Sequence, residues 1–234
     1  MTPAADDEPM PEPNEFTTAL DDALQQLGVT AAPDQLTRLD DHFYLLLEAN
    51  RQFNLTRITD PVQAARLLYA DAAALLAWAA ERTAQSLSLL DVGPGGGFPA
   101  VPLAVLAPDW RITALEATRK KAVFLERSAR RIGIANLDVI HDHGAHWQTD
   151  RRFDLITFKA VGALDLCLLQ GRRYVAPGGH VAIYKTASLP PEETRAGTDA
   201  ARQLSFTELP AFDYELGRGE DSARMALRIY AAST

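Results

Sequence analysis

Cysteine is almost absent from this chain. Its 234 residues include only Cys167, so no disulfide can form within the chain. Disulfide-free chains are typical of reducing compartments, and we therefore expect a cytoplasmic protein. No apolar run reaches the roughly 18 residues that a membrane-spanning helix needs, and the first residues lack the basic and apolar segments of a secretory signal. These absences predict a protein without membrane association, and we expect a monomer.

Basic residues are missing from the beginning of the chain: the first is Arg38, and eight acidic residues precede it. Residues 1–15 are rich in proline and acid and poor in large apolar groups, which predicts a disordered acidic tail. The chain from Arg38 onward holds as many acidic as basic side chains. Its bases are concentrated in one expected helix that contains Arg119, Lys120, Lys121, Arg127, Arg130 and Arg131. Such a cluster fits either a nucleic-acid contact or a solvated helix face.

Residues 16–85 have the apolar spacing of helices. Phe16, Leu20, Leu24 and Leu27 recur at helical intervals, a second helix begins at Pro33, and Asp60-Pro61 is a typical start for a third that runs to about Arg82. These three helices predict an N-terminal helical cap that precedes the domain formed by residues 86–234.

From residue 86 the chain alternates short apolar strands with amphipathic helices, which predicts a parallel sheet with right-handed crossovers. The expected strands are 87–92, 111–116, 138–141, 153–158 and 180–185, and the expected helices are 98–106, 119–132 and 164–174. Two further strands, 204–209 and 224–231, have no helical pattern between them and predict an antiparallel hairpin at the sheet edge. This α/β layout, with a mostly parallel seven-stranded sheet, is that of Rossmann-like class I methyltransferases.

A glycine-rich turn follows the first expected strand, in the sequence Asp91-Val-Gly-Pro-Gly-Gly-Gly-Phe-Pro99. Glycines let such a turn bring backbone N–H groups close to a ligand. A dinucleotide-binding fingerprint would need a third glycine where Phe98 stands. The D-x-G-x-G-x-G register, with Gly93, Gly95 and Gly97, is instead the one that binds the amino-acid end of S-adenosylmethionine in methyltransferases.

Two later strand ends extend the expected cofactor site. Glu116 ends the second strand, where a carboxylate can accept hydrogen bonds from both ribose hydroxyls. The loop after the third strand borders the adenine in this fold, so the backbones of Gly144 and Ala145 are expected contacts. Three histidines share that loop without a nearby cysteine or glutamate, and we expect no metal site there.

Several methyl-acceptor chemistries lack their usual residues. The fourth strand ends at Phe158-Lys159-Ala160, without the Asp/Asn-Pro-Pro-aromatic motif of enzymes that methylate exocyclic amines. Methylation of pyrimidine carbon 5 needs a cysteine nucleophile, whereas Cys167 lies in an apolar helical segment. A ring nitrogen with a free lone pair, such as guanine N7, attacks the sulfonium methyl without a general base, so its methylation depends mainly on proximity and alignment. The sequence identifies no catalytic residue.

Three segments together resemble the RsmG (GidB) family of small-subunit ribosomal RNA methyltransferases. They are Phe53-Asn-Leu-Thr-Arg-Ile-Thr-Asp-Pro61, the glycine turn 91–99, and Lys120-Lys-Ala-Val-Phe-Leu125, and the resemblance extends from about Leu36 to Arg228. It implies transfer of a methyl group from S-adenosylmethionine to N7 of a guanine in 16S ribosomal RNA. It also implies cofactor contacts at Gly93, Phe98, Gly144, Ala145 and Lys159.

The sequence departs from the family's usual residues at several of these positions. Lys159 replaces an arginine, Leu67-Leu68 replaces an Arg-His pair, and Ala145 replaces a common acid. RNA phosphates are expected at Arg51, Arg57, Arg119, Lys120 and Lys121. Two alternatives stay open: a small-molecule methyltransferase on the same fold, and a non-catalytic module that binds RNA or protein.

Overall fold

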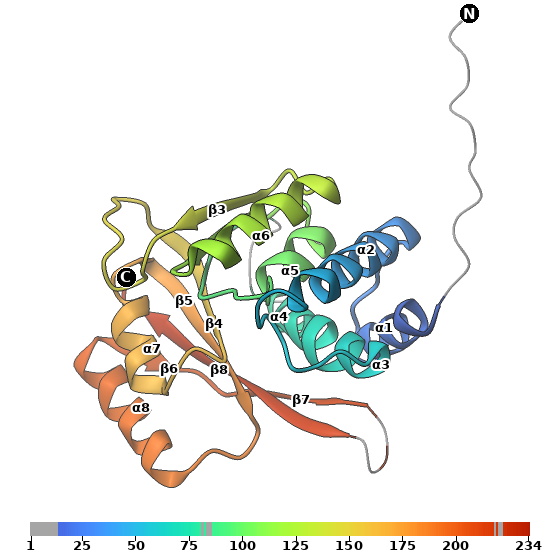
Figure 1. Cartoon of the computed structure of the whole chain (residues 1–234). Helices are drawn as coiled ribbons and strands as arrows, with labels where there is room; N and C mark the ends of the chain where they lie inside the picture. The colour runs from blue at the N-terminus through green and yellow to red at the C-terminus, as the bar shows by residue number, and fades with distance from the viewer. Residues whose placement is uncertain (1–13, 81, 83–85, 218, 220–221) are drawn as a thin grey trace, which may run out of the picture.

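The computed structural model describes residues 14–80, 82, 86–217, 219 and 222–234, and its centre is a single mixed sheet (Figure 1). The strands are β1 (Ser88–Val92), β2 (Arg111–Glu116), β3 (Leu137–His141), β4 (Phe153–Lys159), β5 (Val175–Thr186), β6 (Phe206–Glu208), β7 (Phe212–Leu216) and β8 (Ala223–Ala232). Their order is β3-β2-β1-β4-β5-β8-β6, with β7 also paired to β8. The first five strands are parallel and β8 is antiparallel to β5, which confirms the predicted fold class.

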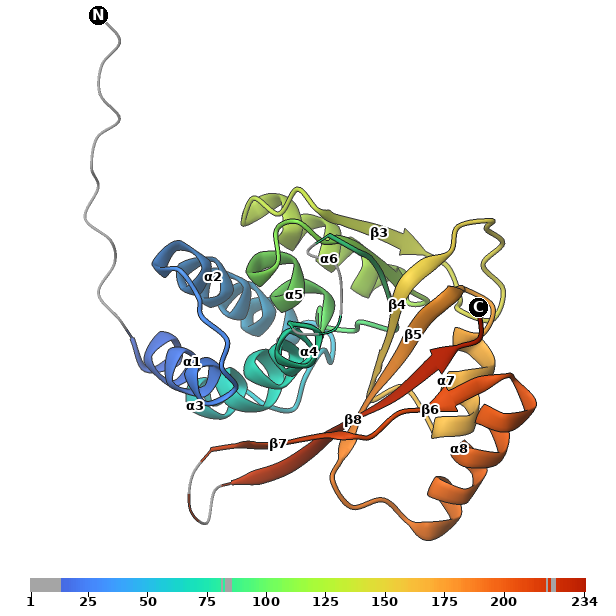
Figure 2. The same cartoon turned by 180° about the vertical axis from the view of Figure 1, so that it is seen from behind.

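The C-terminal edge differs from a simple two-stranded hairpin. Both β6 and β7 pair with β8 in antiparallel register, β6 with Tyr230–Ala232 and β7 with Ala223–Leu227. The sheet therefore has eight strands rather than seven, although β6 and β7 share the position beyond β8. The short acidic strand β7 extends with β8 beneath the cap helices (Figure 2), and it contacts them.

One helix on the C-terminal side was not predicted. Helix α8 (Pro191–Gln203) buries only Gly197 and Ala201, so its inward face consists of small residues rather than the large apolar side chains that reveal a helix in a sequence. Its approach to the helix before it depends on glycine, because a Cβ on Gly197 would lie 2.8 Å from Leu164 Cδ1. The fifth strand also begins earlier than the predicted 180–185, because residues 175–179 belong to β5 at a register irregularity against β4.

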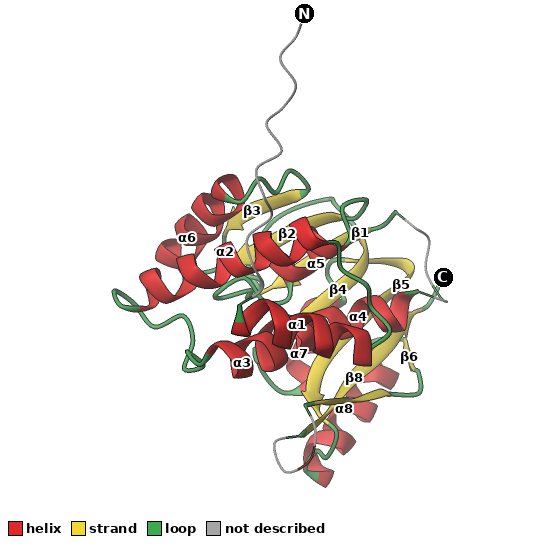
Figure 3. Cartoon of the chain, turned by 90° about the vertical axis from the view of Figure 1, so that its right-hand side faces the viewer, coloured by secondary structure: helices red, strands yellow, loops and turns green. Residues whose placement is uncertain are grey.

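Helices cover both faces of the sheet. Helices α5 (Ala100–Leu106) and α6 (Arg119–Arg131) cover one face together with the cap, whereas α7 (Leu164–Gly171) and α8 cover the other (Figures 1 and 3). The cap consists of α1 (Glu15–Gln26), α2 (Pro33–Asn50), α3 (Pro61–Ala64), the π-helical segment η1 (Ala65–Ala70) and α4 (Asp71–Ala79). The third predicted cap helix is thus one helical stretch with a π-helical interruption.

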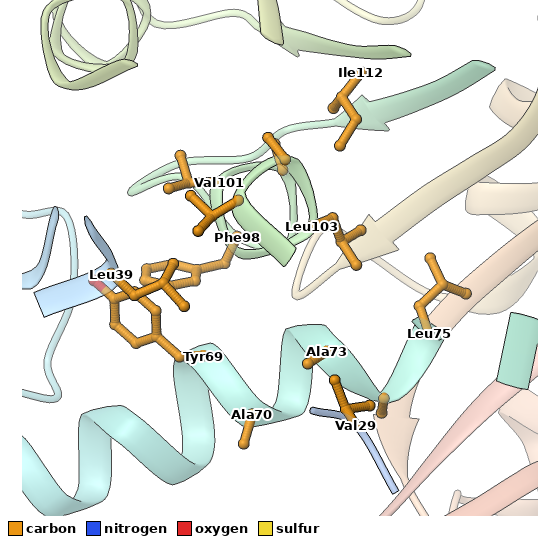
Figure 4. Packing of buried hydrophobic residues seen from close by; sticks show 14 of the residues in the cluster. Val29, Leu39, Tyr69, Ala70, Ala73, Leu75, Phe98, Val101, Leu103 and Ile112 are labelled. Atoms are coloured by element: carbon orange, nitrogen blue, oxygen red, sulfur yellow. The ribbon is translucent and has the colours of Figure 1, made fainter. Parts of the chain in front are cut away.

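The cap and the sheet share one hydrophobic core. A single cluster of buried residues includes Leu39 of α2, Tyr69 of η1 and Val101 of α5, together with Phe98 (Figure 4). The acidic tail was predicted for residues 1–15, of which 1–13 lie outside the described residues. Asn14 and Glu15 belong to α1 instead: the Asn14 side chain accepts a hydrogen bond from the Thr17 N–H and caps the helix. Within the described part of the chain, no helix has both the length and the apolar character that crossing a membrane requires.

Candidate cofactor-binding site

A pocket of about 270 Å³ opens at the carboxyl ends of β1 and β2. Ligands bind at this edge of open parallel sheets because the loops that follow the strands converge there. Its lining comes from four loops and one helix: Val92, Gly93, Leu115, Glu116, Ala117, His143, Gly144, Val161, Gly162, Leu166, Cys167 and Gln170. The structure thus brings together Gly93, Glu116 and Gly144, three of the residues predicted from sequence.

The glycine turn reaches the pocket through its first half. Gly93 has φ +74° and Gly95 φ +58°, conformations that non-glycine residues rarely adopt. A Cβ on Gly93 would lie 3.1 Å from Val161 Cγ2 on the pocket wall, so a side chain there would crowd the pocket. A Cβ on Gly95 would meet no atom within 4 Å, because this part of the turn faces open space.

Glu116 fixes the glycine turn from the neighbouring strand. Its side-chain Oε2 accepts a hydrogen bond from the Gly95 N–H at 3.0 Å, and Oε1 accepts one from the Thr118 N–H at 2.8 Å. The residue is 5% exposed and lines the pocket. Each carboxylate oxygen can accept a second hydrogen bond, so Glu116 retains the capacity to bind two hydroxyl groups of a ligand.

The loop after β3 contributes Gly144 but not the side chain of Ala145. The Gly144 carbonyl accepts a hydrogen bond from the buried Tyr174 hydroxyl at 2.6 Å, which fixes the loop over the pocket. Ala145 is exposed and absent from the pocket lining, and its N–H donates to His143 Nδ1 at 3.2 Å. Among the described residues no group of three histidine, cysteine or acidic side chains is arranged to hold a metal ion.

Asp91 lies beneath the glycine turn rather than in the pocket. It is fully buried; Oδ2 accepts a hydrogen bond from the Ala100 N–H at 2.9 Å and Oδ1 accepts one from the Thr157 hydroxyl at 3.1 Å. Burial raises the pKa of this carboxyl to about 7, against the opposing effect of these two donors. Asp91 therefore connects β1, β4 and the first residue of α5, and it shapes the turn from below.

Gly97 and Phe98 face the cap, so the structure places these two predicted contacts outside the pocket lining. The Phe98 ring packs edge-on against Tyr69, with centroids 4.9 Å apart, and the residue is 8% exposed (Figure 4). A Cβ on Gly97 would lie 2.8 Å from Val101 Cγ2. The end of the turn thus packs against the cap, and this packing explains why apolar residues, Phe98 and Pro99, stand there.

Lys159 is turned away from the pocket by an ion pair with the cap. Its Nζ lies 2.7 Å from Asp71 Oδ2, and the two side chains are 14% and 1% exposed. The Tyr214 hydroxyl of β7 donates to Asp71 Oδ1 at 2.5 Å. The cofactor contact at Lys159 stays a prediction, and in this structure Lys159 takes part in a buried link among the sheet, the cap and the C-terminal hairpin.

The five predicted RNA contacts lie on two segments. Arg51 and Arg57 are exposed in the connection between α2 and α3, and Arg119 and Lys120 are exposed at the start of α6, with Lys121 half-buried. Within the described ranges none of the five forms an ion pair. The first segment is rigid because the Asn50 side-chain oxygen accepts hydrogen bonds from the Leu55 and Thr56 N–H groups.

His42 of α2 supports the glycine turn from the cap side. It is fully buried, its Nδ1 lies 2.7 Å from the Tyr69 hydroxyl, and its Nε2 has no hydrogen-bond partner among the described residues. A Cβ on Gly97 would lie 3.1 Å from that Nε2. Burial lowers the pKa of His42 from 6.5 to about 3.

The stabilisation that the neutral ring of His42 provides is expected to fall in mild acid. Its ring stays neutral in the folded state down to about pH 3, whereas the unfolded chain takes up a proton below about pH 6.5. The stabilisation present above pH 6.5 is therefore lost as the pH falls, by about 2 kcal/mol at pH 5. Urea unfolding of the wild type and His42→Gln at pH 7.5 and pH 5 tests this through the difference between their free energies of unfolding, which should change with pH. The opposing contribution of Asp91 is common to both proteins and cancels. Equal pH dependence of the two proteins would contradict the assignment.

Comparison with known proteins gives a consistent family and fold. The model of the family described as rRNA small subunit methyltransferase G matches residues 35–211. The chain is 31% identical over 209 residues to "Ribosomal RNA small subunit methyltransferase G" of Leuconostoc citreum, covering 88% of this chain and 85% of that protein. It is 35% identical over 162 residues to the protein of the same name from Solibacter usitatus, covering 69% and 75%.

Solved structures with low sequence identity share the fold. The YcgJ protein of Bacillus subtilis aligns with a TM-score of 0.55 at 10% identity, covering 70% of this chain and 98% of that one. A precorrin-6y C5,15-methyltransferase from Geobacter metallireducens aligns with a TM-score of 0.52 at 14% identity, covering 65% and 83%.

Proposed function

Because the chain belongs to the rRNA small subunit methyltransferase G family, we propose that it transfers a methyl group from S-adenosylmethionine to N7 of a guanine in bacterial 16S ribosomal RNA. The observation that supports the proposal is the pocket at the ends of β1 and β2, where the positive-φ turn at Gly93 meets the buried carboxylate of Glu116. We also propose that the protein acts as a cytoplasmic monomer.

The residues of the pocket fit S-adenosylmethionine. The Gly93 turn has room for the amino-acid end only while residue 93 lacks a side chain, and Glu116 retains acceptor capacity for the ribose hydroxyls. The remaining wall contains Leu115, Leu166 and Cys167, which suit a flat base. When bound, the cofactor supplies an electrophilic methyl group on a sulfonium sulfur.

Guanine N7 suits this site because its methylation needs no general base. Its lone pair forms the new nitrogen–carbon bond without prior loss of a proton, while the carbon–sulfur bond breaks and its electron pair stays on the sulfur. Among the charged groups near the pocket, Glu116 is engaged with two backbone N–H groups and Lys159 with Asp71. The protein's contribution is therefore to hold the two reactants in line.

Methyl transfer from radiolabelled S-adenosylmethionine tests this function directly. Purified protein is incubated with 16S ribosomal RNA or with small subunits, the RNA is digested, and the labelled nucleoside is identified. Labelled 7-methylguanosine is the expected product. Cofactor binding with label transferred to small molecules but never to RNA would support a metabolite methyltransferase, and no cofactor binding would identify a non-catalytic module.

Neutralising Lys120 and Lys121 together is expected to weaken RNA binding and to reduce its dependence on salt. Both residues lie at the start of α6, next to the strand end that carries Glu116. Each lost phosphate contact should reduce the slope of log K against log salt by about 0.7–0.9. Binding of a 16S fragment by Lys120→Gln/Lys121→Gln is measured by fluorescence anisotropy at several salt concentrations.

The matched control removes two charges from the far end of the same helix. Arg130 and Arg131 are exposed in the last turn of α6, so Arg130→Gln/Arg131→Gln produces the same change in net charge away from the pocket mouth. The control should retain the wild-type slope. Equal effects of the two double variants would show that net charge, rather than the start of α6, controls the affinity.

A further inference from the structure

Gln170 of α7 is a polar side chain in the pocket wall without an assigned role. It lines the pocket, it is half-buried, and its carboxamide forms no hydrogen bond with any described residue. Most neighbouring wall residues are apolar, including Leu115, Leu166 and Cys167. A carboxamide that faces such a pocket unpaired gains most from a ligand that offers both a donor and an acceptor.

The loop after β3 is shaped to leave room for this side chain. A Cβ on Gly144 would lie 2.9 Å from Gln170 Cδ and 2.9 Å from Val92 Cγ1, so any other residue at position 144 would displace the carboxamide. The Gly144 carbonyl is fixed by the Tyr174 hydroxyl at 2.6 Å. The side chain of Gln170 therefore extends from α7 toward this loop, and it lies at the end of the pocket that the loop forms.

The order of groups along the pocket determines which part of the cofactor reaches Gln170. The glycine turn after β1 faces the amino-acid end, and Glu116 at the end of β2 faces the ribose hydroxyls. The base is attached to the other side of the ribose, so it lies beyond Glu116, between Leu115, Gly144 and α7. An adenine there presents its 6-amino group and ring nitrogens to the polar atoms of that wall.

We propose that Gln170 is the residue that recognises the adenine of the cofactor. Its carboxamide oxygen accepts a hydrogen bond from the 6-amino group, and its NH₂ group donates to the adjacent ring nitrogen, the pairing that glutamine makes with adenine elsewhere. This inference rests on the proposed use of S-adenosylmethionine.

The other polar groups of that region are less suited to this role. Ala145 has no polar side-chain atom and is exposed, and His143 Nδ1 already accepts the Ala145 N–H. Glu116 is committed to the glycine turn and the ribose side. Gln170 is therefore the one side chain of the described pocket lining that keeps both a strong donor and a strong acceptor free, because the acceptor nitrogen of His143 is already used.

Titration calorimetry with two ligands tests the proposal. The first ligand is S-adenosylhomocysteine, and the second is its analogue in which hydrogen replaces the 6-amino group. The wild type should bind the first about tenfold more tightly. Gln170→Leu should bind both ligands with nearly equal, reduced affinity. Gln170→Glu keeps an acceptor but has no donor, so it should still prefer the 6-amino ligand.

Gln203→Leu is the matched control, because Gln203 is exposed at the end of α8 and absent from the pocket lining. It should retain the wild-type preference. A Gln170→Leu protein with wild-type thermal stability and an unchanged preference for the 6-amino ligand would overturn the assignment of Gln170. Failure of the wild type to bind S-adenosylhomocysteine at all would instead count against the proposed function.

Discussion

Replacing Gly93 with aspartate is expected to reduce the affinity for S-adenosylmethionine about a hundredfold, a loss of roughly 3 kcal/mol. The new Cβ would lie 3.1 Å from Val161 Cγ2 on the pocket wall, at a backbone φ of +74° that costs about 1–2 kcal/mol for a non-glycine residue. The added carboxylate would also repel the carboxylate of the cofactor. Titration calorimetry of the wild type and the variant measures the loss.

The control for Gly93→Asp places an aspartate at a glycine with a similar positive φ that lies away from the pocket. Gly28, just beyond α1, has φ +71°, and a Cβ there would meet no atom within 4 Å. Gly28→Asp should lower the melting temperature by a similar amount and retain full cofactor affinity. If both variants bound the cofactor equally well, the turn at Gly93 would not be the cofactor site. Gly93→Ala should have an affinity between those of the wild type and Gly93→Asp. Alanine adds the steric contact with Val161 but no charge, so this variant separates the steric effect from the electrostatic one.

The parts of the site on strand ends could be predicted from the sequence. Gly93 and Glu116 follow short apolar strands, and parallel pairing brings the ends of β1 and β2 together without any information beyond the strand pattern. The same pattern predicted the five parallel strands. The register of the glycine turn carried chemical information because glycine adopts its positive φ angles without the steric cost that other residues incur.

The contacts made across the fold could not be predicted in the same way. Gln170 lies in a short, mostly apolar helix, and nothing local indicates that α7 closes the pocket. The cofactor contact at Phe98 stays a prediction, and the motif gave no sign that the Phe98 ring packs against Tyr69 of the cap. The inward face of helix α8 consists of small residues such as Gly197 and Ala201, so it lacks the large apolar side chains by which the other helices were predicted.

The ion pair of Lys159 is another contact that the sequence does not reveal, and its loss is expected to have a large effect on stability. The sequence gives a cation at the end of β4 but does not reveal that Asp71, 88 positions earlier by residue number, lies beside it. The pair joins the cap to the strand next to Asp91, and the Tyr214 hydroxyl connects it to β7. A carboxylate that joins three parts of the fold should matter more to stability than its single charge suggests.

Replacing Asp71 with alanine is accordingly expected to lower the free energy of unfolding by about 3–5 kcal/mol. The substitution leaves the ammonium of Lys159 almost buried without its counter-charge and the Tyr214 hydroxyl without its acceptor. Chemical denaturation of the wild type and Asp71→Ala at pH 7.5 measures the difference. The exposed pair of Asp199 and Arg202 provides the control, and Asp199→Ala should cost less than about 1 kcal/mol.

A double variant separates the ion pair from simple loss of packing. In Asp71→Leu/Lys159→Met both charges are replaced by apolar side chains of similar size, so no unpaired charge remains buried. Its stability should recover most of the loss seen in Asp71→Ala, although the Tyr214 hydroxyl still lacks its acceptor. A double variant as unstable as Asp71→Ala would show that the cost comes from the cavity and the tyrosine. Full stability in Asp71→Ala itself would show that Lys159 finds water when Asp71 is removed, and that the cap is held by its apolar contacts alone.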